Sequence, residues 1–354
     1  MTAERDVRAI WAATERLVGG RDPSTRVGGD DSDTYGEGPA AERLEARVAA
    51  LLGKEAAVWM PSGTMAQQIA LRIHADRRGT RTVAFHPHCH LDVHEERGYE
   101  HLHGLHARLL GDRNRLVEPG DLDDVHEPLA AVLLELPQRD LGGRLPAWDD
   151  LVAVSERARE LGAALHLDGA RLWQCGPFYG RALAEIAALF DTVYVSFYKD
   201  LAAPAGCALA GPADAIAEAR IWEVRHGGRM FSVHPLLVAA ERGLDEVLPR
   251  MEEYVAHARA LGAALAELDD VSVVPDPPQV AMLHAYVRRP LDPLREATLD
   301  LAERERVWLG SPWAPTADPA VQRTELSVSE ASLAVAPAEA AALYRELLEL
   351  SRPG

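Results

Sequence analysis

The position of one lysine, Lys199, suggests that it reacts as a free amine rather than serving as a surface charge. The chain contains only two lysines, Lys54 and Lys199, beside 35 arginines. Lys199 follows the apolar run VYVSFY at 193–198, which predicts a buried strand leading into a loop. Arginine stays charged under ordinary conditions, whereas a desolvated lysine can lose its proton and form a Schiff base with an aldehyde. Lys199 is therefore the candidate nucleophile, while Lys54, in LLGKEAAV, is typical of a solvated surface charge.

A turn of small residues, PSGTM at 61–65, lies between a strand-like run and a helical one. This order points free backbone N–H groups at a phosphate, and the hydroxyls of Ser62 and Thr64 are additional donors. The alternative is an ordinary helix N-cap, in which Ser or Thr satisfies only the first turn.

A carboxylate also stands at the end of a predicted strand. Asp168 is the last residue of the apolar run ALHLD at 164–168. Ligands of α/β proteins bind at the carboxyl ends of buried parallel strands, although Asp168 could instead cap the following helix. Lys199 comes just after the next predicted strand, at the corresponding end. An acid that keeps a pyridine nitrogen protonated, a lysine that holds an aldehyde and a phosphate cradle are together what pyridoxal phosphate requires.

The elements that carry these residues alternate between helical and apolar stretches from about residue 40 to 240, which predicts an α/β fold. Helical patterns cover 41–53 and 148–162. Because the strands lack polar alternation, we expect a central, mainly parallel sheet that helices cover on both faces. The predicted strands are 56–60, 82–85, 130–136, 164–168, 192–197 and 207–211.

The pattern changes near residue 238 to long helices, followed by strand-like runs at 271–275 and 282–287 and a helix at 337–350. We therefore expect a large domain over 1–240 and a smaller α+β domain over 241–354. The large domain would begin with an amphipathic helix that stops at Gly19 and Gly20, and with an acidic loop at 27–39.

Composition excludes several classes of partner. A net charge of −18 and a pI near 5.2 would repel nucleic acid and anionic membrane surfaces. No apolar run approaches the ~20 residues of a membrane span, and the amino-terminal segment is no signal peptide. Cys89, Cys175 and Cys207 form no CxxC pair or disulfide framework, which indicates a reducing, cytoplasmic location.

Seven motifs in one order resemble those of fold-type I pyridoxal-phosphate enzymes, in the group of threonine aldolases and β-eliminating lyases. The resemblance implies that group's seven-stranded type of sheet and a homodimer or homotetramer with its active site at the subunit interface. The motifs are DDSDTYGEGP, LGKEAAVWMPSGTMAQQIAL, HLDVHEERG, LELPQRDLGGRLP, LHLDGARLW, SFYKDLAAPAGCALAG and RHGGRMF.

By position, the resemblance implies that Lys199 holds the cofactor aldehyde and that Asp168 pairs with the pyridine nitrogen. His90 would stack on the pyridine ring near the scissile bond and act in catalysis. The remaining implied contacts are Ser62, Gly63 and Thr64 to the phosphate, Arg171 to the cofactor phenolate oxygen or the substrate carboxylate, Arg323 to the substrate carboxylate, and Tyr35 and Arg229 near the active site, in part across the dimer interface.

The chain departs from the family in its amino-terminal segment, where RDPSTRV at 21–27 replaces the family's Arg-Ser-Asp-Thr, and at two further positions. Gln138 stands where threonine aldolases carry a second histidine near the substrate hydroxyl, and glutamine can hydrogen-bond but cannot take a proton at neutral pH. Asp200 follows the lysine where the family commonly has glycine.

The expected function is a lyase that cleaves the Cα–Cβ bond of a small β-hydroxy-α-amino acid to give glycine and an aldehyde. β-Elimination, racemisation or transamination with the same cofactor is the alternative. A protein that uses a metal held by His86, His88 and His90 is a remote alternative, although we assign no metal ligand. A non-catalytic binding protein of the same fold also stays open.

Overall fold

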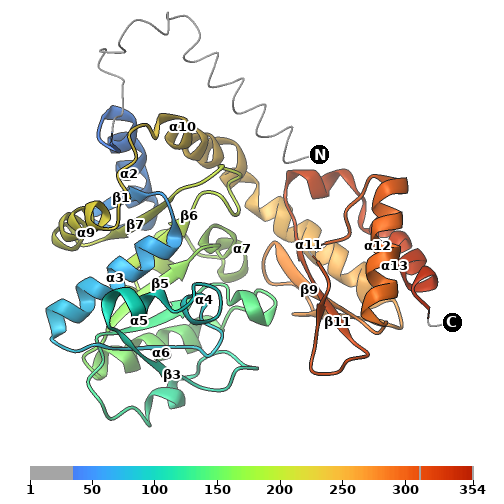
Figure 1. The fold of residues 1–354 in the computed structure, drawn as a ribbon, viewed down its shortest axis with the longest axis horizontal. Coiled ribbons are helices and arrows are strands. Elements are labelled where there is room, and N and C mark those ends of the chain that lie inside the picture. The colour runs from blue at the N-terminus through green and yellow to red at the C-terminus, as the bar shows by residue number, and fades with distance from the viewer. Residues whose placement is uncertain (1–34, 311, 353–354) are drawn as a thin grey trace, which may run out of the picture. The chain divides into compact units, whose positions relative to one another are not determined.

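The computed structural model describes residues 35–310 and 312–352, which fall into two compact units. Unit 1 consists of the described part of Met1–Leu136 together with Pro146–Pro249, and unit 2 of Pro137–Leu145 together with the described part of Arg250–Gly354 (Figure 1). The boundary expected after residue 240 would fall inside helix α10 (His234–Arg242). The expected amino-terminal helix and most of the loop at 27–39 lie outside the described residues.

Unit 1 is built on a seven-stranded sheet of order β1-β7-β6-β5-β4-β2-β3. The five strands from β6 to β3 run parallel, whereas β7 is antiparallel to both of its neighbours. The expected mainly parallel α/β sheet is thus confirmed. Its strands are β1 (Ala56–Met60), β2 (Thr82–Phe85), β3 (His106–Leu109), β4 (Ala131–Glu135), β5 (Ala164–Gly169), β6 (Thr192–Ser196) and β7 (Cys207–Gly211).

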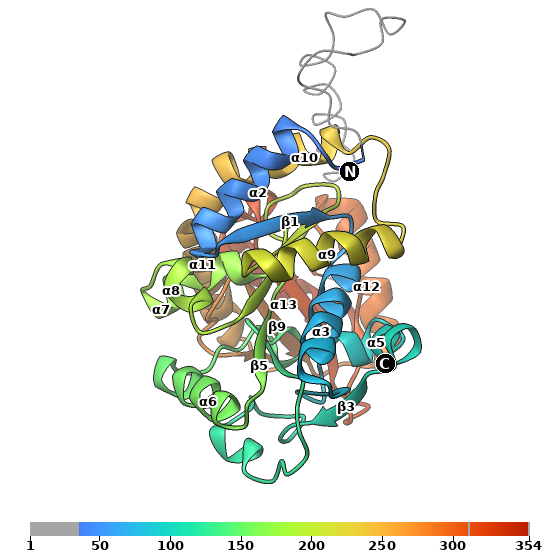
Figure 2. The same ribbon diagram turned by 90° about the vertical axis from the view of Figure 1, so that its left-hand side faces the viewer.

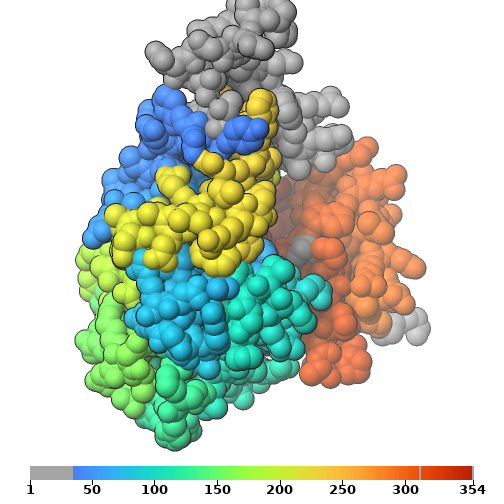
Figure 3. Space-filling model, turned by 60° about the vertical axis from the view of Figure 1, so that its left-hand side comes forward, coloured from blue at the N-terminus to red at the C-terminus, as the bar shows by residue number. Residues whose placement is uncertain are grey.

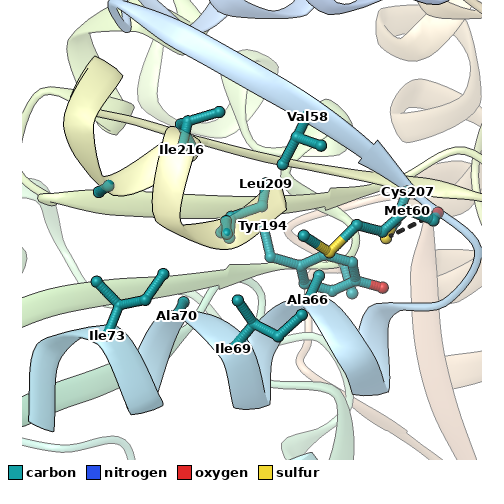
Figure 4. Packing of buried hydrophobic residues seen from close by; sticks show 13 residues of the cluster. Val58, Met60, Ala66, Ile69, Ala70, Ile73, Tyr194, Cys207, Leu209 and Ile216 are labelled. Atoms are coloured by element: carbon teal, nitrogen blue, oxygen red, sulfur yellow. Dashed lines mark hydrogen bonds between the residues drawn. The ribbon is translucent and has the colours of Figure 1, made fainter. Parts of the chain in front are cut away.

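Helices cover both faces of this sheet. Helices α3 (Gly63–Arg78) and α9 (Ala213–Arg225) pack on one face, and α2 (Pro39–Leu52) and α6 (Trp148–Glu160) lie on the other (Figure 2). Figure 4 shows the core beneath α3, where Ile69 and Ile73 meet Tyr194 and Leu209 of the sheet. The shorter helices of unit 1 are α4 (His90–Val93), α5 (Gly98–His103), α7 (Gly176–Tyr179) and α8 (Leu183–Ala187).

Local sequence determines where α2 and α3, the helices before and after β1 in the chain, begin and end. Pro39 starts α2, and Gly53 ends it in the left-handed conformation. Ser62 caps α3, because its side chain accepts a hydrogen bond from the Met65 N–H at 3.3 Å. Because β1 ends at Met60 and Ser62 caps α3, the chain between them is a short, fixed turn.

Unit 2 contains a four-stranded antiparallel sheet of order β10-β11-β9-β8 with three long helices. It is the expected smaller α+β part of the chain. Its main elements are α11 (Met251–Ala266), β8 (Val271–Val274), β9 (Met282–Val287), α12 (Leu291–Glu305), β10 (Ala314–Pro315), β11 (Gln322–Ser327) and α13 (Pro337–Leu350). Across the described residues, the helices fall short of the length and apolarity that a membrane crossing requires.

Candidate active site

Four polar residues of unit 1 lie at or near the ends of the parallel strands β4, β5 and β6. The register pairs Glu135 with Asp168 and Asp168 with Tyr194, so all three stand at one level of the sheet. Lys199 follows the end of β6 by three residues. The carboxyl edge of the sheet, the usual ligand position of α/β folds, therefore carries Asp168 and Lys199, two of the residues that the sequence singled out.

Asp168 is a buried carboxylate, with only 2% of its surface exposed. Its Oδ1 atom accepts a hydrogen bond from the Ala170 N–H at 3.0 Å, which fixes the side chain at the strand end. A carboxylate held in this way can keep a cationic ring nitrogen protonated.

Lys199 is half-buried, and its backbone N–H donates to the Ser196 hydroxyl at 3.2 Å. Burial lowers the pKa of its amine; the carboxylate of Asp168 opposes that shift, and the guanidinium of Arg171 adds to it. A lowered pKa increases the share of free amine, which is the nucleophilic form. Lys54, expected to be solvated, is instead half-buried and donates to the Phe190 carbonyl at 2.5 Å.

The first turn of α3, from Gly63 onward, is the candidate phosphate site. The backbone N–H groups at a helix start have no partner within the helix, and they carry the positive end of its dipole. Gly63 is buried there, and a Cβ atom at this position would collide with the hydroxyl and ring of Tyr194. Figure 4 shows the Tyr194 hydroxyl pointing toward this end of α3. The absence of a side chain at Gly63 thus lets Tyr194 of β6 and the start of α3 approach closely.

Gly63→Ala should lower the free energy of unfolding by about 1–3 kcal/mol, because Tyr194 is packed in the core and cannot yield without strain. Urea denaturation measures this change. Gly120→Ala is the matched control, since nothing lies within 4 Å of a Cβ atom at that position. Equal stabilities of the two variants would contradict the close packing at Gly63.

His90 begins α4 and is oriented by a carboxylate. Its Nδ1 atom lies 2.9 Å from Oε1 of Glu95, whose side chain is only 2% exposed. An ionised carboxylate only accepts hydrogen bonds, so Nδ1 carries the proton and Nε2 is left as the basic nitrogen. His90 can therefore accept a proton at Nε2 and share the resulting charge with Glu95.

The electrostatics of neighbouring groups connect the His90 segment to the strand ends. The pKa of the Cys89 thiol is raised by burial and then by the carboxylates of Glu135, Asp168 and Glu95. The pKa of Tyr198 is likewise raised, chiefly by burial, with contributions from Asp168 and Glu95. Cys89 and Tyr198, which directly precede His90 and Lys199, are thus acted on by the same carboxylates, Asp168 and Glu95.

Tyr35 and Arg229 lie on a pair of exposed segments of unit 1. The Tyr35 N–H donates to the Phe231 carbonyl at 3.0 Å, and the two rings meet edge to face at 5.4 Å. Arg229 forms an ion pair with Glu37. The two segments are therefore joined to each other, with the Tyr35 ring about half exposed.

Gln138 and Arg323 belong to unit 2. Gln138 is buried and precedes Arg139, whose Nε atom forms an ion pair with Oε2 of Glu325 at 2.8 Å. Arg323 lies two residues before Glu325 on β11, and therefore on the same face of that strand. Unit 2 brings the Gln138 loop against the face of β11 that carries Arg323.

The histidine cluster does not resemble a metal site. Both ring nitrogens of His86 meet backbone groups, with Nε2 2.8 Å from the Arg115 carbonyl and Nδ1 accepting the His88 N–H at 3.0 Å. Within residues 35–310 and 312–352, no three His, Cys, Asp or Glu side chains are grouped to hold an ion.

The sequence did not indicate three residues that lie near the candidate site, namely Glu135, Tyr194 and Gln174. Glu135 and Tyr194 read as ordinary members of apolar strand runs, and their relation to Asp168 exists only through the strand register. Gln174 donates to Asp200 at 2.6 Å, a contact between residues far apart in sequence. An acidic or phenolic residue beside a predicted strand end is the one signal that could have indicated Glu135 and Tyr194.

Comparisons with known proteins identify the family and the fold of this chain. Residues 24–289 match the beta-eliminating lyase family. A Listeria monocytogenes protein, provisionally assigned as an L-allo-threonine aldolase, is 40% identical, with 92% of this chain and 91% of that chain covered and a TM-score of 0.86.

Two curated relatives are also similar. Low-specificity L-threonine aldolase 1 of Arabidopsis thaliana is 30% identical over 69% of this chain and 70% of its own length. The low specificity L-threonine aldolase of Escherichia coli K12 is 31% identical over 66% of this chain and 72% of its own length. The family and the fold neighbours are pyridoxal-phosphate enzymes of fold type I. This chain belongs to the beta-eliminating lyase family, and its fold is that of the fold-type I enzymes.

Proposed function

We propose that this protein is a pyridoxal-phosphate-dependent lyase that cleaves a small β-hydroxy-α-amino acid into glycine and an aldehyde. The observation that carries the proposal is that Lys199, a lysine of lowered pKa, and Asp168, a buried carboxylate whose charge acts on it, both stand at the carboxyl edge of the sheet. Three relatives that are named as threonine or allo-threonine aldolases support the reaction class.

The residues present fit the cofactor. The turn at Ser62, Gly63 and Thr64 offers helix-start N–H groups to a phosphate, and Asp168 offers a carboxylate to a ring nitrogen. Lys199 offers its amine to the aldehyde. When bound, pyridoxal phosphate supplies that aldehyde and an electron sink for the pair released from the broken Cα–Cβ bond. Asp168 makes the sink effective because its negative charge favours a protonated ring nitrogen.

The general base in this proposal is His90. Its Nε2 atom takes the proton of the substrate β-hydroxyl, directly or through one water, as the Cα–Cβ bond breaks. Glu95 holds the imidazole in the tautomer that leaves Nε2 unprotonated and then stabilises the imidazolium. Gln138, which cannot take that proton, is assigned to hydrogen bonding only.

His90→Ala should lower kcat for cleavage about 10²–10⁴-fold, the usual contribution of a general base, and weaken cofactor binding far less. Steady-state kinetics and a cofactor titration measure the two effects separately. His94→Ala is the matched control, because that ring is exposed and lies 5.0 Å from His90 by ring centroids. Comparable kcat values for the two variants would remove His90 from catalysis.

Recognition of the substrate carboxylate is assigned to arginines. Arg171 follows Asp168 by three residues, and its charge acts on the Lys199 amine. A planar guanidinium binds a carboxylate through two parallel hydrogen bonds, which would fix the amino acid in one orientation. Arg323 is assigned to the same task by the family resemblance, and Tyr35 and Arg229 are assigned to the rim of the site.

The likeness to family dimers and an exposed apolar surface support a homodimer or homotetramer with the active site at the subunit interface. Helix α9, yellow in Figure 3, lies on the surface of unit 1 above α3. Exposed apolar side chains of this size commonly mark a protein contact. Those on α9 and the following segment are Ile221, Val224, Met230 and Phe231, and Tyr35 adjoins Phe231. Sedimentation equilibrium tests the assembly.

A cytoplasmic location is part of the same proposal. Cys89, Cys175 and Cys207 are all buried and none forms a disulfide. Free thiols persist where the compartment is reducing.

The test of the proposed cofactor is the visible absorption spectrum of the purified protein. A band that borohydride bleaches, and that glycine or threonine shifts, is the expected result, because borohydride reduces a Schiff base. A colourless protein that stays colourless after addition of pyridoxal phosphate would overturn the proposal.

A further inference from the structure

Two side-chain contacts join the segment that follows β5 to the end of β6 and the loop beyond it. The Trp173 indole N–H donates to the Ser196 carbonyl at 2.7 Å. The Gln174 amide donates to Oδ1 of Asp200 at 2.6 Å. The segment carries Arg171, and the loop carries Lys199. The bond between Gln174 and Asp200 therefore fixes the position of Lys199 relative to the end of β5.

Asp200, the residue that follows Lys199, is half-buried as a whole, but its carboxylate is enclosed. Its Oδ2 atom is enclosed and has no hydrogen-bond partner among the described residues, and the same holds for Oε1 of Gln174. A buried carboxylate with one unsatisfied oxygen is costly unless cations lie near it. The cations that act on Asp200 are Arg171 and Lys199, and the Cys175 thiol also feels its charge.

These charges affect the pKa of Asp200 itself and the pKa of the Lys199 amine. Burial raises the pKa of Asp200 to about 6, while Arg171, the Gln174 hydrogen bond and Lys199 limit the rise. Asp200 is thus mainly ionised at neutral pH. Its charge raises the pKa of Lys199, as do those of Asp168 and Glu135, whereas burial and Arg171 lower it.

We propose that Asp200 is a positioning residue for Lys199: held by Gln174, its enclosed carboxylate is the counter-charge that keeps Arg171 and the lysine amine in place. A glycine at this position could supply neither the hydrogen bond nor the charge. The importance of this arrangement for catalysis rests on the proposed function, but the charge relation itself is a property of the chain.

The chain offers a direct assay, because Lys54 and Lys199 are its only lysines. The full chain, freed of cofactor with hydroxylamine, is treated with a trace of labelled acetic anhydride at a series of pH values. The pH at which each lysine peptide reaches half of its maximal acylation, read by mass spectrometry, gives the pKa of that amine. Lys54 is an internal control, because the charges that act on it are Asp191 and Arg159.

Asp200→Asn keeps the size of the side chain and its hydrogen bonding to Gln174 but removes the charge. We expect the acylation midpoint of Lys199 to fall by about one pH unit, which is the usual effect of losing one nearby charge. The midpoint of Lys54 should stay unchanged. Gln174→Met keeps the charge and loses the hydrogen bond, so it should give a smaller shift in the same direction. If circular dichroism finds Asp200→Asn unfolded, Asp200→Gly replaces it with the same expectation.

An unchanged Lys199 midpoint in the folded variant would overturn the proposal. Equal shifts at both lysines would overturn it as well, because they would reflect general loosening of the fold. Neither result depends on cofactor binding, so a failure of this proposal is distinguishable from a failure of the proposed function.

Discussion

Lys199→Ala abolishes the borohydride-fixed attachment of pyridoxal phosphate to the chain and lowers kcat for cleavage by at least about 10⁴-fold. This is the expected result because the side chain supplies the only amine at the strand end that can bind the aldehyde, and loss of such a group removes most of the catalysis. Mass spectrometry of the reduced protein detects the attachment, and steady-state kinetics measures kcat.

The matched control for this experiment is Lys54→Arg. Lys54 is the other lysine of the chain and is also half-buried with a lowered pKa, but it donates to the Phe190 carbonyl, away from Asp168. Lys54→Arg should retain the attachment and most of the activity. An adduct of unchanged yield in Lys199→Ala would mean that another group binds the cofactor.

Asp168→Asn should lower kcat on the order of 10³-fold while leaving the fold intact. The asparagine oxygen can still accept the Ala170 N–H, so the strand end keeps its shape. The neutral amide, however, cannot hold a pyridine nitrogen in its protonated form, and the electron sink is weakened. Kinetics on the variant, together with its thermal unfolding curve, separates the chemical effect from a structural one.

Asp191→Asn provides the comparison for Asp168→Asn. Asp191 also accepts a backbone N–H, that of Leu165 at 2.7 Å, but it does so at the opposite end of β5. We expect kcat within about twofold of the parent protein. If Asp168→Asn were as active as Asp191→Asn, the pairing of Asp168 with the cofactor would be wrong.

The sequence predicted the buried strands of unit 1 well, because an apolar run with no polar alternation has few other uses. Six of the seven strands match the predicted runs closely, from Ala56–Met60 to Cys207–Gly211. The exception is β3 (His106–Leu109), whose residues are mostly exposed at the edge of the sheet. An edge strand needs no apolar pattern, so HARL carried no signal.

Unit 2 was predicted in outline only. Strands β8 and β9 and helix α13 follow from their patterns, but β11 (Gln322–Ser327) alternates buried polar residues with half-exposed charged ones. Gln322 and Thr324 are each only 1% exposed, which no hydropathy pattern predicts. The membership of 137–145 in unit 2 is likewise a tertiary property, carried by contacts such as Arg139 with Glu325.

Among the candidate site residues, the ones that sequence could indicate stand at the ends of predicted elements. Lys199, Asp168 and Ser62 are of this kind, since strand ends and helix starts are readable from pattern. The partners that orient them, such as Glu95 for His90 and Gln174 for Asp200, act through side-chain geometry. Their roles depend on distances of 2.6 to 2.9 Å that the sequence does not contain.

The central claim is cleavage of a Cα–Cβ bond, and product analysis tests it most directly. The purified protein, supplied with pyridoxal phosphate, is incubated with L-threonine and separately with L-allo-threonine, and glycine, acetaldehyde, 2-oxobutanoate and ammonia are quantified. We predict glycine and acetaldehyde in equal amounts from at least one of the two substrates, and none from the Lys199→Ala protein. Formation of 2-oxobutanoate and ammonia without glycine would contradict the account and assign the chain to β-elimination.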